Sequence, residues 1–354
     1  MRAKVCLRDR VPRHCIVTHS AIPELTQIEE LIEAGGSRLE TRRLAEIDAG
    51  AGGRFPLYSI AFGNPDPAVP AIGFFGGVHG LERIGADVVI AYLRHLIMRL
   101  RWDGILHRQL ESVRLVFMPL VNPGGMWLGT RANPNGVDLM RNAPLEAQTS
   151  VPPLLGGQRI SARLPWYRGR RDEAMEIENL ALCETVKTEL LSRNFSIALD
   201  CHSGFGLKDR IWFPYAHTRT PLPHLAEIHA LDEVLRQTHG SHPYIIEPQS
   251  LQYLAHGDIW DYLHLRACQA EGRIFLPLTL EMGSWLWVKK NPRQLFSRHG
   301  IFNPQIAHRQ QRVLRRHLPL LDFLSRAACS QHLWIPDAEA RADHHARAMA
   351  KWYP

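Results

Sequence analysis

Two short motifs place metal-binding types of side chain directly after predicted buried strands. The first, GGVHGLE, carries His79 and Glu82, and the second, LDCHSG, carries His202. Imidazole nitrogens and carboxylate oxygens are common zinc ligands, and a catalytic zinc site commonly uses three protein ligands and a water molecule. The pattern therefore predicts one cation held by two histidines and a glutamate that meet only in the folded chain.

A further carboxylate, Glu281, lies at the end of the apolar segment RIFLPLTLEM. Hydrolysis of an amide bond needs a base that takes a proton from water and an acid that returns it to the leaving amine, and one positioned carboxylate can do both. Each motif alone has an ordinary alternative, such as a core histidine or a helix first-turn acid. The convergence of several such strand ends favours a catalytic centre.

Short apolar segments alternate with helical segments along most of the chain. Strands are expected at 55–62, 71–77, 113–120, 195–200, 243–247 and 273–282. Helices are expected at 22–34, 85–100, 173–192, 223–238, 257–266 and 304–327. This alternation predicts an α/β fold with a mixed, mostly parallel twisted sheet and helices on both faces. In such sheets ligands bind beyond the carboxyl ends of the strands, where the polar motifs lie.

Five motifs, in order, resemble those of the zinc carboxypeptidase family, the relatives of pancreatic carboxypeptidase and of bacterial enzymes that trim cell-wall peptides. The motifs are HGLE at 79–82, NPGG at 122–125, GVDLMRN at 136–142, CHSG at 201–204 and LTLEMG at 278–283. The resemblance covers roughly residues 55 to 325. It implies a zinc-carboxypeptidase-like fold, one Zn²⁺ per chain and hydrolysis of a peptide or amide bond.

The resemblance also implies roles for single residues of the catalytic centre. His79, Glu82 and His202 are similar to the zinc ligands of the family, and Glu281 to its general base and acid. Arg131 would polarise the scissile carbonyl. Asp138 would accept a hydrogen bond from the first zinc histidine and so orient it.

Three further residues would bind substrate if the resemblance holds. Arg141 would meet the substrate carboxylate, Asn142 would support it, and Tyr253 would close over the substrate. The chain departs from the family where GVDLNRNF is usual, because Met140 stands in place of the asparagine. Methionine has no amide to donate a hydrogen bond, so recognition of a terminal carboxylate is the feature that this departure weakens.

The motifs predict a single large catalytic domain over residues 51–328. Residues 1–50 are expected to form an N-terminal extension with a helix that packs on this domain, and residues 329–354 a C-terminal tail.

The resemblance to the zinc carboxypeptidase family implies that the substrate is a peptide. One alternative is an N-acyl amino acid deacylase of the aspartoacylase type, which keeps the HxxE pair and the distant histidine. A second is a non-catalytic binding protein on the same fold.

Composition adds expectations about location and partners. The 354 residues are 45% hydrophobic, but no apolar stretch reaches the roughly 18–20 residues of a membrane span, and no signal-peptide core is visible. A cytoplasmic protein without membrane attachment is expected, with free thiols, since the six cysteines form no CxxC pair. The net charge of +7 comes from residues 289–354, whose basic helix reads as amphipathic, so nucleic-acid binding is not expected. Nothing indicates an oligomeric state.

Overall fold

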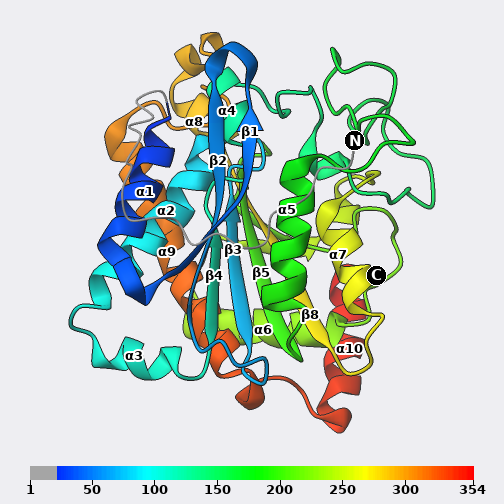
Figure 1. Ribbon diagram of the computed structural model, residues 1–354. Helices are drawn as coiled ribbons and strands as arrows, with labels where there is room; N and C mark the ends of the chain where they lie inside the picture. Colours follow the sequence, from blue (N-terminus) through cyan, green and yellow to red (C-terminus); the bar gives the residue numbers. More distant parts are fainter. Residues whose placement is uncertain (1–21) are drawn as a thin grey trace.

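A computed structural model describes residues 22–354 of the chain (Figure 1). Most of the N-terminal segment in which no signal-peptide core is visible lies outside the described residues. The described part contains one eight-stranded sheet with strand order β1-β2-β4-β3-β5-β8-β6-β7. Its strands are β1 (Glu40–Asp48), β2 (Arg54–Gly63), β3 (Ala71–Gly76), β4 (Arg114–Met118), β5 (Phe195–Ser203), β6 (Arg210–Phe213), β7 (Ile245–Pro248) and β8 (Ile274–Met282).

The central strands β4, β3, β5 and β8 run parallel, as do β6 and β7, while β1, β2 and the β6–β8 pair are antiparallel. This arrangement confirms the predicted mixed, mostly parallel sheet. Two of its strands were not expected. β1 is a polar edge strand that pairs with β2, and β6 is only four residues long.

Helices cover both faces of the sheet. They are α1 (Pro23–Gly35), α2 (Arg83–Arg99), α3 (Gly104–Leu110), α4 (Pro123–Leu128), α5 (Ile177–Thr185), α6 (Leu225–Thr238), α7 (Ile259–Ala267), α8 (Trp285–Lys290), α9 (Ala307–Cys329) and α10 (Ala338–Trp352). Figure 1 shows α1, α2 and α9 grouped on one side and α5 and α7 on the other. None of the helices within residues 22–354 is long and apolar enough to cross a lipid bilayer.

Successive strand side chains supply two separate cores. Phe74 belongs to the cluster beneath α1, α2 and α9, and its neighbour Phe75 belongs to the cluster beneath α5 and α7. This alternation is the period-two pattern of a strand buried on both faces. Because β4, β3, β5 and β8 are parallel, their carboxyl ends lie at one common edge of the sheet, and the last residues of these strands lie there.

The two chain segments outside residues 51–328 are folded onto the sheet where the structure describes them. α1 buries Leu25, Ile28 and Leu31 in the first core, and β1 lies before residue 51. At the other end α10 packs on α6 and buries Trp352, whose indole donates a hydrogen bond to the Ile246 carbonyl.

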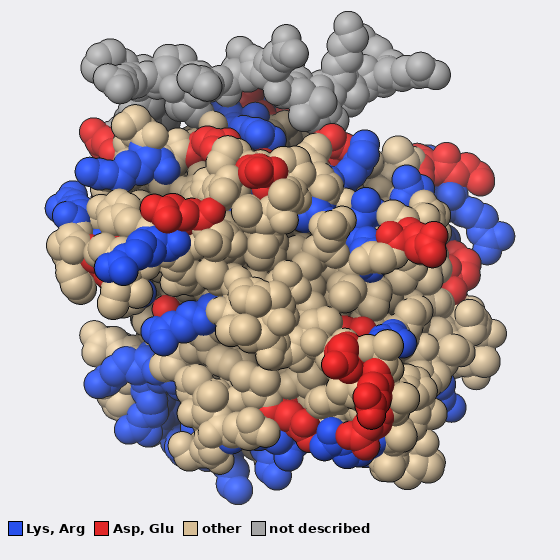
Figure 2. Space-filling view, turned by 90° about the horizontal axis from the view of Figure 1, so that it is seen from below, with Lys and Arg blue, Asp and Glu red and all other residues tan. Residues whose placement is uncertain are grey.

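The C-terminal positive charge is distributed over solvated helix faces. α9 buries Val313 and Leu321, while Arg312, Arg315 and Arg316 are exposed, as an amphipathic helix requires. On the face in Figure 2, basic side chains are densest at the lower left, and acidic and uncharged side chains cover much of the rest.

Candidate metal centre

His79 and His202 reach one point from two adjacent parallel strands, β3 and β5. Nδ1 of His79 lies 3.2 Å from Nδ1 of His202, and the two oxygens of Glu82 lie 3.0 Å and 3.1 Å from these nitrogens. All three side chains are buried. Ligand atoms around a tetrahedral zinc are about 3.3 Å apart when each bond is about 2.0–2.1 Å. The two nitrogens and the two carboxylate oxygens thus have spacings that fit a single zinc ion.

Each histidine directs its second ring nitrogen to a buried carboxylate. Nε2 of His79 lies 3.2 Å from Oδ1 of Asp138, and Nε2 of His202 lies 2.6 Å from Oδ2 of Asp200. This partner fixes the ring so that Nδ1 carries the free lone pair, as in the carboxylate–histidine–zinc arrangement. The contact of Asp138 with His79 agrees with the role that the GVDLMRN motif implies for this aspartate. Sequence reasoning missed Asp200, although an aspartate two residues before His202 in an apolar strand must face the same side of the sheet.

Neighbouring charges shift the pKa values of these buried groups. Burial alone would raise the pKa of Glu82, but His79 and His202 outweigh it and bring the pKa well below its usual range. Arg131 and His79 act likewise on Asp138, against burial, and the pKa of Asp138 is lowered. For His202, Asp200 and Glu82 outweigh burial and raise the pKa well above its usual value. Glu82 and Asp138 are therefore carboxylates, and the carboxylate is the form in which Glu82 can bind a cation.

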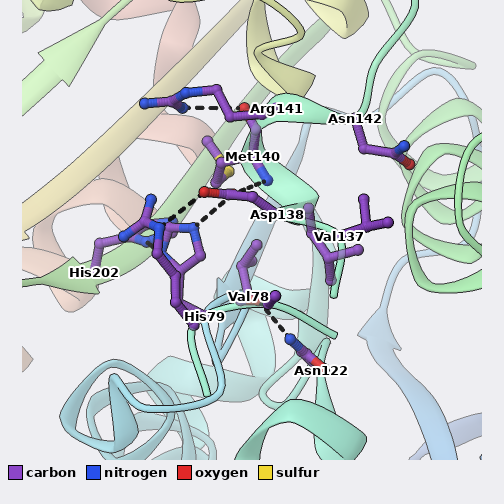
Figure 3. A network of polar contacts seen from close by, with 12 residues as sticks. Val78, His79, Asn122, Val137, Asp138, Met140, Arg141, Asn142 and His202 are labelled. Carbon is purple, nitrogen blue, oxygen red and sulfur yellow. Dashed lines mark hydrogen bonds and ion pairs between the residues drawn. The ribbon is translucent and has the colours of Figure 1, made fainter. Parts of the chain in front are cut away.

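Backbone contacts keep the metal-binding loop in place. The Asn122 side chain donates a hydrogen bond to the carbonyl of Val78, next to His79, and accepts one from the Gly125 amide at the start of α4 (Figure 3). Gly85, in the first turn of α2, lies against the end of β5, where a Cβ would come 2.1 Å from the Cys201 carbonyl oxygen. Only glycine lets α2 approach the strand that carries His202 so closely.

Glu281 lies beside His202 because the two are register partners in the parallel strands β5 and β8. Its Oε1 accepts a hydrogen bond from the Phe205 amide at 3.0 Å. Burial and the charge of Glu82 raise the pKa of Glu281 to about 8, while His202 and Arg131 act in the opposite direction. The structure thus brings the predicted base to the predicted metal ligands.

Arg131 also reaches the metal ligands. Its Nε donates to Oδ2 of Asp138 at 2.8 Å, and one terminal nitrogen donates to Oε1 of Glu82 at 3.3 Å. A quarter of its side chain remains exposed, 27%, which leaves part of the guanidinium facing solvent. The neighbouring carboxylates keep the pKa of Arg131 above its ordinary value despite burial.

The predicted substrate-binding residues divide into two groups. Arg141 is buried, and its guanidinium lies 5.8 Å from the centre of the Tyr253 ring. Its hydrogen bonds go to the carbonyls of Met140 and Leu155 and to the Tyr253 hydroxyl, at 3.2 to 3.5 Å. Among the described residues no carboxylate lies within ion-pairing distance of Arg141.

Asn142 is placed differently. Figure 3 shows its amide pointing away from His79 and His202. Its nitrogen donates to the Arg168 carbonyl at 3.0 Å, and its oxygen accepts from the Glu176 amide at 2.7 Å. The amide thus holds the segment between residues 168 and 179, and the structure does not bring it to the metal-binding side chains.

Comparison with known proteins identifies the family. The zinc carboxypeptidase family model matches residues 39–283, so the chain belongs to the zinc carboxypeptidase family. This finding confirms the resemblance drawn from the five motifs. Zinc is the metal of this family, and the His79, Glu82 and His202 cluster fits it.

The relatives are distant. The carboxypeptidase N catalytic chain of Rattus norvegicus is 27% identical over 228 residues, which are 56% of this chain and 48% of that protein. Carboxypeptidase SOL1 of Arabidopsis thaliana is 32% identical over 105 residues, or 29% of this chain and 21% of that protein. The matches thus span about half or less of these relatives' lengths.

Solved structures show the same fold. Bovine thrombin-activatable fibrinolysis inhibitor, solved in complex with tick carboxypeptidase inhibitor, superposes with a TM-score of 0.62 at 17% identity. The match covers 86% of this chain and 95% of that chain. At this identity the likeness establishes the α/β fold and its sheet, which agrees with the predicted fold class.

Proposed function

We propose that the protein is a zinc-dependent metallocarboxypeptidase that removes the C-terminal residue of a peptide, with one catalytic Zn²⁺ per chain. The observation that supports this most directly is the cluster of His79, Glu82 and His202, with their donor atoms 3.0 to 3.2 Å apart and Glu281 beside them. Membership of the zinc carboxypeptidase family supports the same reaction class.

Zinc, when bound by these three residues, supplies a Lewis acid that lowers the pKa of water and polarises a carbonyl. Glu281 then takes a proton from the attacking water and delivers it to the leaving amine. The Phe205 amide donates a hydrogen bond to Oε1 of Glu281 and so fixes the orientation of the carboxyl group. Burial and Glu82 raise the pKa of Glu281, whereas His202 and Arg131 act in the opposite direction and favour the ionised form that accepts the proton.

Arg131 is proposed to stabilise the negative charge that develops on the carbonyl oxygen. A donor that is already oriented when the charge appears contributes most, because it does not need to reorganise. The hydrogen bonds of Arg131 to Asp138 and Glu82 provide that orientation. The same bonds connect Arg131 to the partner of His79, so its loss affects metal binding as well as the reaction.

Arg141 is proposed to bind the free carboxylate of the substrate. A buried guanidinium without a carboxylate partner among the described residues is expected to attract an anion, and an Arg–carboxylate pair is commonly bidentate. Tyr253 contacts this guanidinium and is proposed to cover the bound end of the peptide. No corresponding contact supports a substrate-binding role for Asn142, whose amide is used within the fold.

The test compares peptides that differ only at the C-terminus, as free acid and as amide, with the zinc-loaded protein. Release of the last amino acid from the free acid, and little release from the amide, is the expected result. N-acyl amino acids form a second arm of the same assay. Faster turnover of N-acyl amino acids than of any peptide would instead favour the deacylase reaction. Failure of the protein to bind zinc, together with no turnover of either substrate class, would favour a binding protein.

A further inference from the structure

A second group of metal-binding side chains lies between α6 and α7, away from the catalytic cluster. His264 and Cys268 stand four positions apart, at the end of α7 and directly after it, and so face the same side. His224 precedes the first residue of α6. Nδ1 of His224 lies 3.1 Å from Nε2 of His264, and Sγ of Cys268 lies 4.0 Å from that same Nε2. All three donor atoms lie within 4.8 Å of one another.

The distance between the two imidazole nitrogens is close to that in a tetrahedral metal site. With zinc–nitrogen bonds of about 2.0–2.1 Å and a zinc–sulfur bond of about 2.3 Å, ligand nitrogens are about 3.3 Å apart and nitrogen and sulfur about 3.6 Å apart. The His224–His264 pair meets the first value within a few tenths of an ångström. Sγ of Cys268 lies 3.7 Å from Nδ1 of His264 and 4.0 Å from Nε2, so the thiol lies over the ring and must turn to another rotamer to meet the second value. Cys268 is an exposed residue whose side chain has room to turn.

The side chain of His264 is fully buried and held in one orientation. Its Nδ1 lies 3.0 Å from the Tyr215 hydroxyl. If that nitrogen carries the proton and donates it to Tyr215, then Nε2 presents its lone pair to the space between His224 and Cys268. Zinc-bound histidines commonly have a hydrogen-bond acceptor of this kind on the second ring nitrogen.

A third cluster provides a contrast. His229, Glu233 and His344 also lie within reach of one ion. There, however, Glu233 is already paired with Arg347 at 2.6 Å, and Arg347 and Lys351 both act on His229 as positive charges. At the His224, His264 and Cys268 cluster the nearby charges are more balanced, because Glu227 and Arg341 act on His224 in opposite directions.

We propose that His224, His264 and Cys268 bind a second zinc ion, with solvent completing its coordination at the exposed thiol side. This site is separate from the proposed catalytic site and does not depend on the proposed function. Thiolate and imidazole are ligands that select zinc over magnesium or calcium. A thiol binds a metal as the thiolate, so binding at Cys268 releases its proton.

The position of the site indicates its role. The indole of Trp260, one turn before His264 on α7, donates a hydrogen bond to Asp200 at 2.8 Å, and Asp200 is the partner of His202. A metal between α6 and α7 ties the far end of the same helix to its neighbour. The second ion is therefore structural, and it stabilises the helix that supports the catalytic centre.

Cobalt provides the test, because only the second site contains a thiol. Metal-free protein is titrated with Co²⁺ while the near-ultraviolet thiolate-to-cobalt charge-transfer band is recorded. The intact protein is expected to bind two equivalents, one of which gives the band. Cys268→Ser should bind one equivalent without the band and keep its peptidase activity. Cys329→Ser, which removes a partly buried thiol elsewhere, is the matched control and should behave like the intact protein.

Two further variants separate this proposal from the catalytic one. Glu82→Gln should weaken the other equivalent and leave the charge-transfer band unchanged. Tyr215→Phe should weaken the thiolate-bearing equivalent about tenfold to a hundredfold through the orientation of His264. A single equivalent without a thiolate band in the intact protein, or a band that survives in Cys268→Ser, would overturn the second site whatever the peptidase assay shows.

Discussion

Asp200 offers a sharp test of how the fold positions the metal. Its carboxylate is fully buried, and Oδ2 lies 2.6 Å from Nε2 of His202 and accepts the Trp260 indole N–H at 2.8 Å. Oδ1 has no hydrogen-bond partner. In Asp200→Asn the amide oxygen can occupy the place of Oδ2 and keep both contacts, with the NH₂ group at the place of Oδ1. The substitution therefore removes the negative charge behind His202 while leaving its geometry nearly intact.

The expected magnitude follows from the role of such partners. Loss of the group that orients and polarises a zinc histidine typically lowers metal affinity about tenfold to a hundredfold. That range corresponds to about 1.4 to 2.7 kcal/mol of zinc-binding free energy. Zinc affinity is measured by competition with a chromogenic chelator, starting from metal-free protein. With saturating zinc, kcat should fall much less than in a variant of Glu281, because Asp200 does not touch the substrate.

A matched control isolates the effect. Asp232 on α6 is equally buried and is paired with Arg236 and Lys351, with no contact to the metal ligands. Asp232→Asn should lower the stability of the fold and leave zinc affinity as in the intact protein. If Asp200→Asn binds zinc within about twofold of the intact protein, or if both variants lose affinity equally, the positioning role of Asp200 is refuted.

Further predictions concern the base, the carboxylate receptor and a buried acid. Glu281→Gln should lower kcat about a hundredfold to ten-thousandfold while zinc stoichiometry is retained, and an active variant would contradict the role of Glu281 as base. Arg141→Lys keeps the charge but loses the planar fork, so kcat/KM for free-acid peptides should fall about tenfold or more and the preference over amidated peptides should narrow. Burial raises the pKa of Glu178 from its ordinary value of 4.5 to about 7. Between these two pH values the folded state holds a proton that the unfolded state has lost. The stability contributed by that proton is present below the unfolded pKa and is lost as pH rises from about 4.5 toward 7. Glu178→Gln, followed by urea unfolding from pH 5 to 8, should gain stability relative to the intact protein as pH rises, by at most about 3 kcal/mol. A difference independent of pH would contradict the raised pKa.

The elements that the sequence predicted are those with strong apolar patterns. β3, β5 and β8 are buried along nearly their whole length, so their apolar runs stand out in the sequence. β1 was missed because its residues, ETRRLAEID, are largely polar and exposed on the edge of the sheet. β6 was missed because four residues give too short a pattern. Both become strands through pairing with a neighbour, which local sequence does not encode.

The composition of the metal centre was determined by the sequence alone. His79, Glu82, His202 and Glu281 each lie at or shortly after the end of an apolar segment, and parallel strands of one sheet end at a common edge. The side-chain types then limit the chemistry to a cation with a nearby base. In this sense the donor set and its approximate location required no coordinates.

Only the tertiary structure decided which atoms of these side chains point toward the proposed metal position and which residues hold them in that orientation. It showed that both histidines turn Nδ1 inward, because Asp138 approaches Nε2 of His79 from a distant segment and Asp200 approaches Nε2 of His202 from the same strand. It also showed that the amide of Asn142 binds residues 168 to 179, whereas Arg141, one position earlier, lies against Tyr253. The physical reason is the same in each case. The direction in which a side chain makes its hydrogen bonds is set by packing against partners that are mostly distant in sequence, and not by spacing along the chain alone.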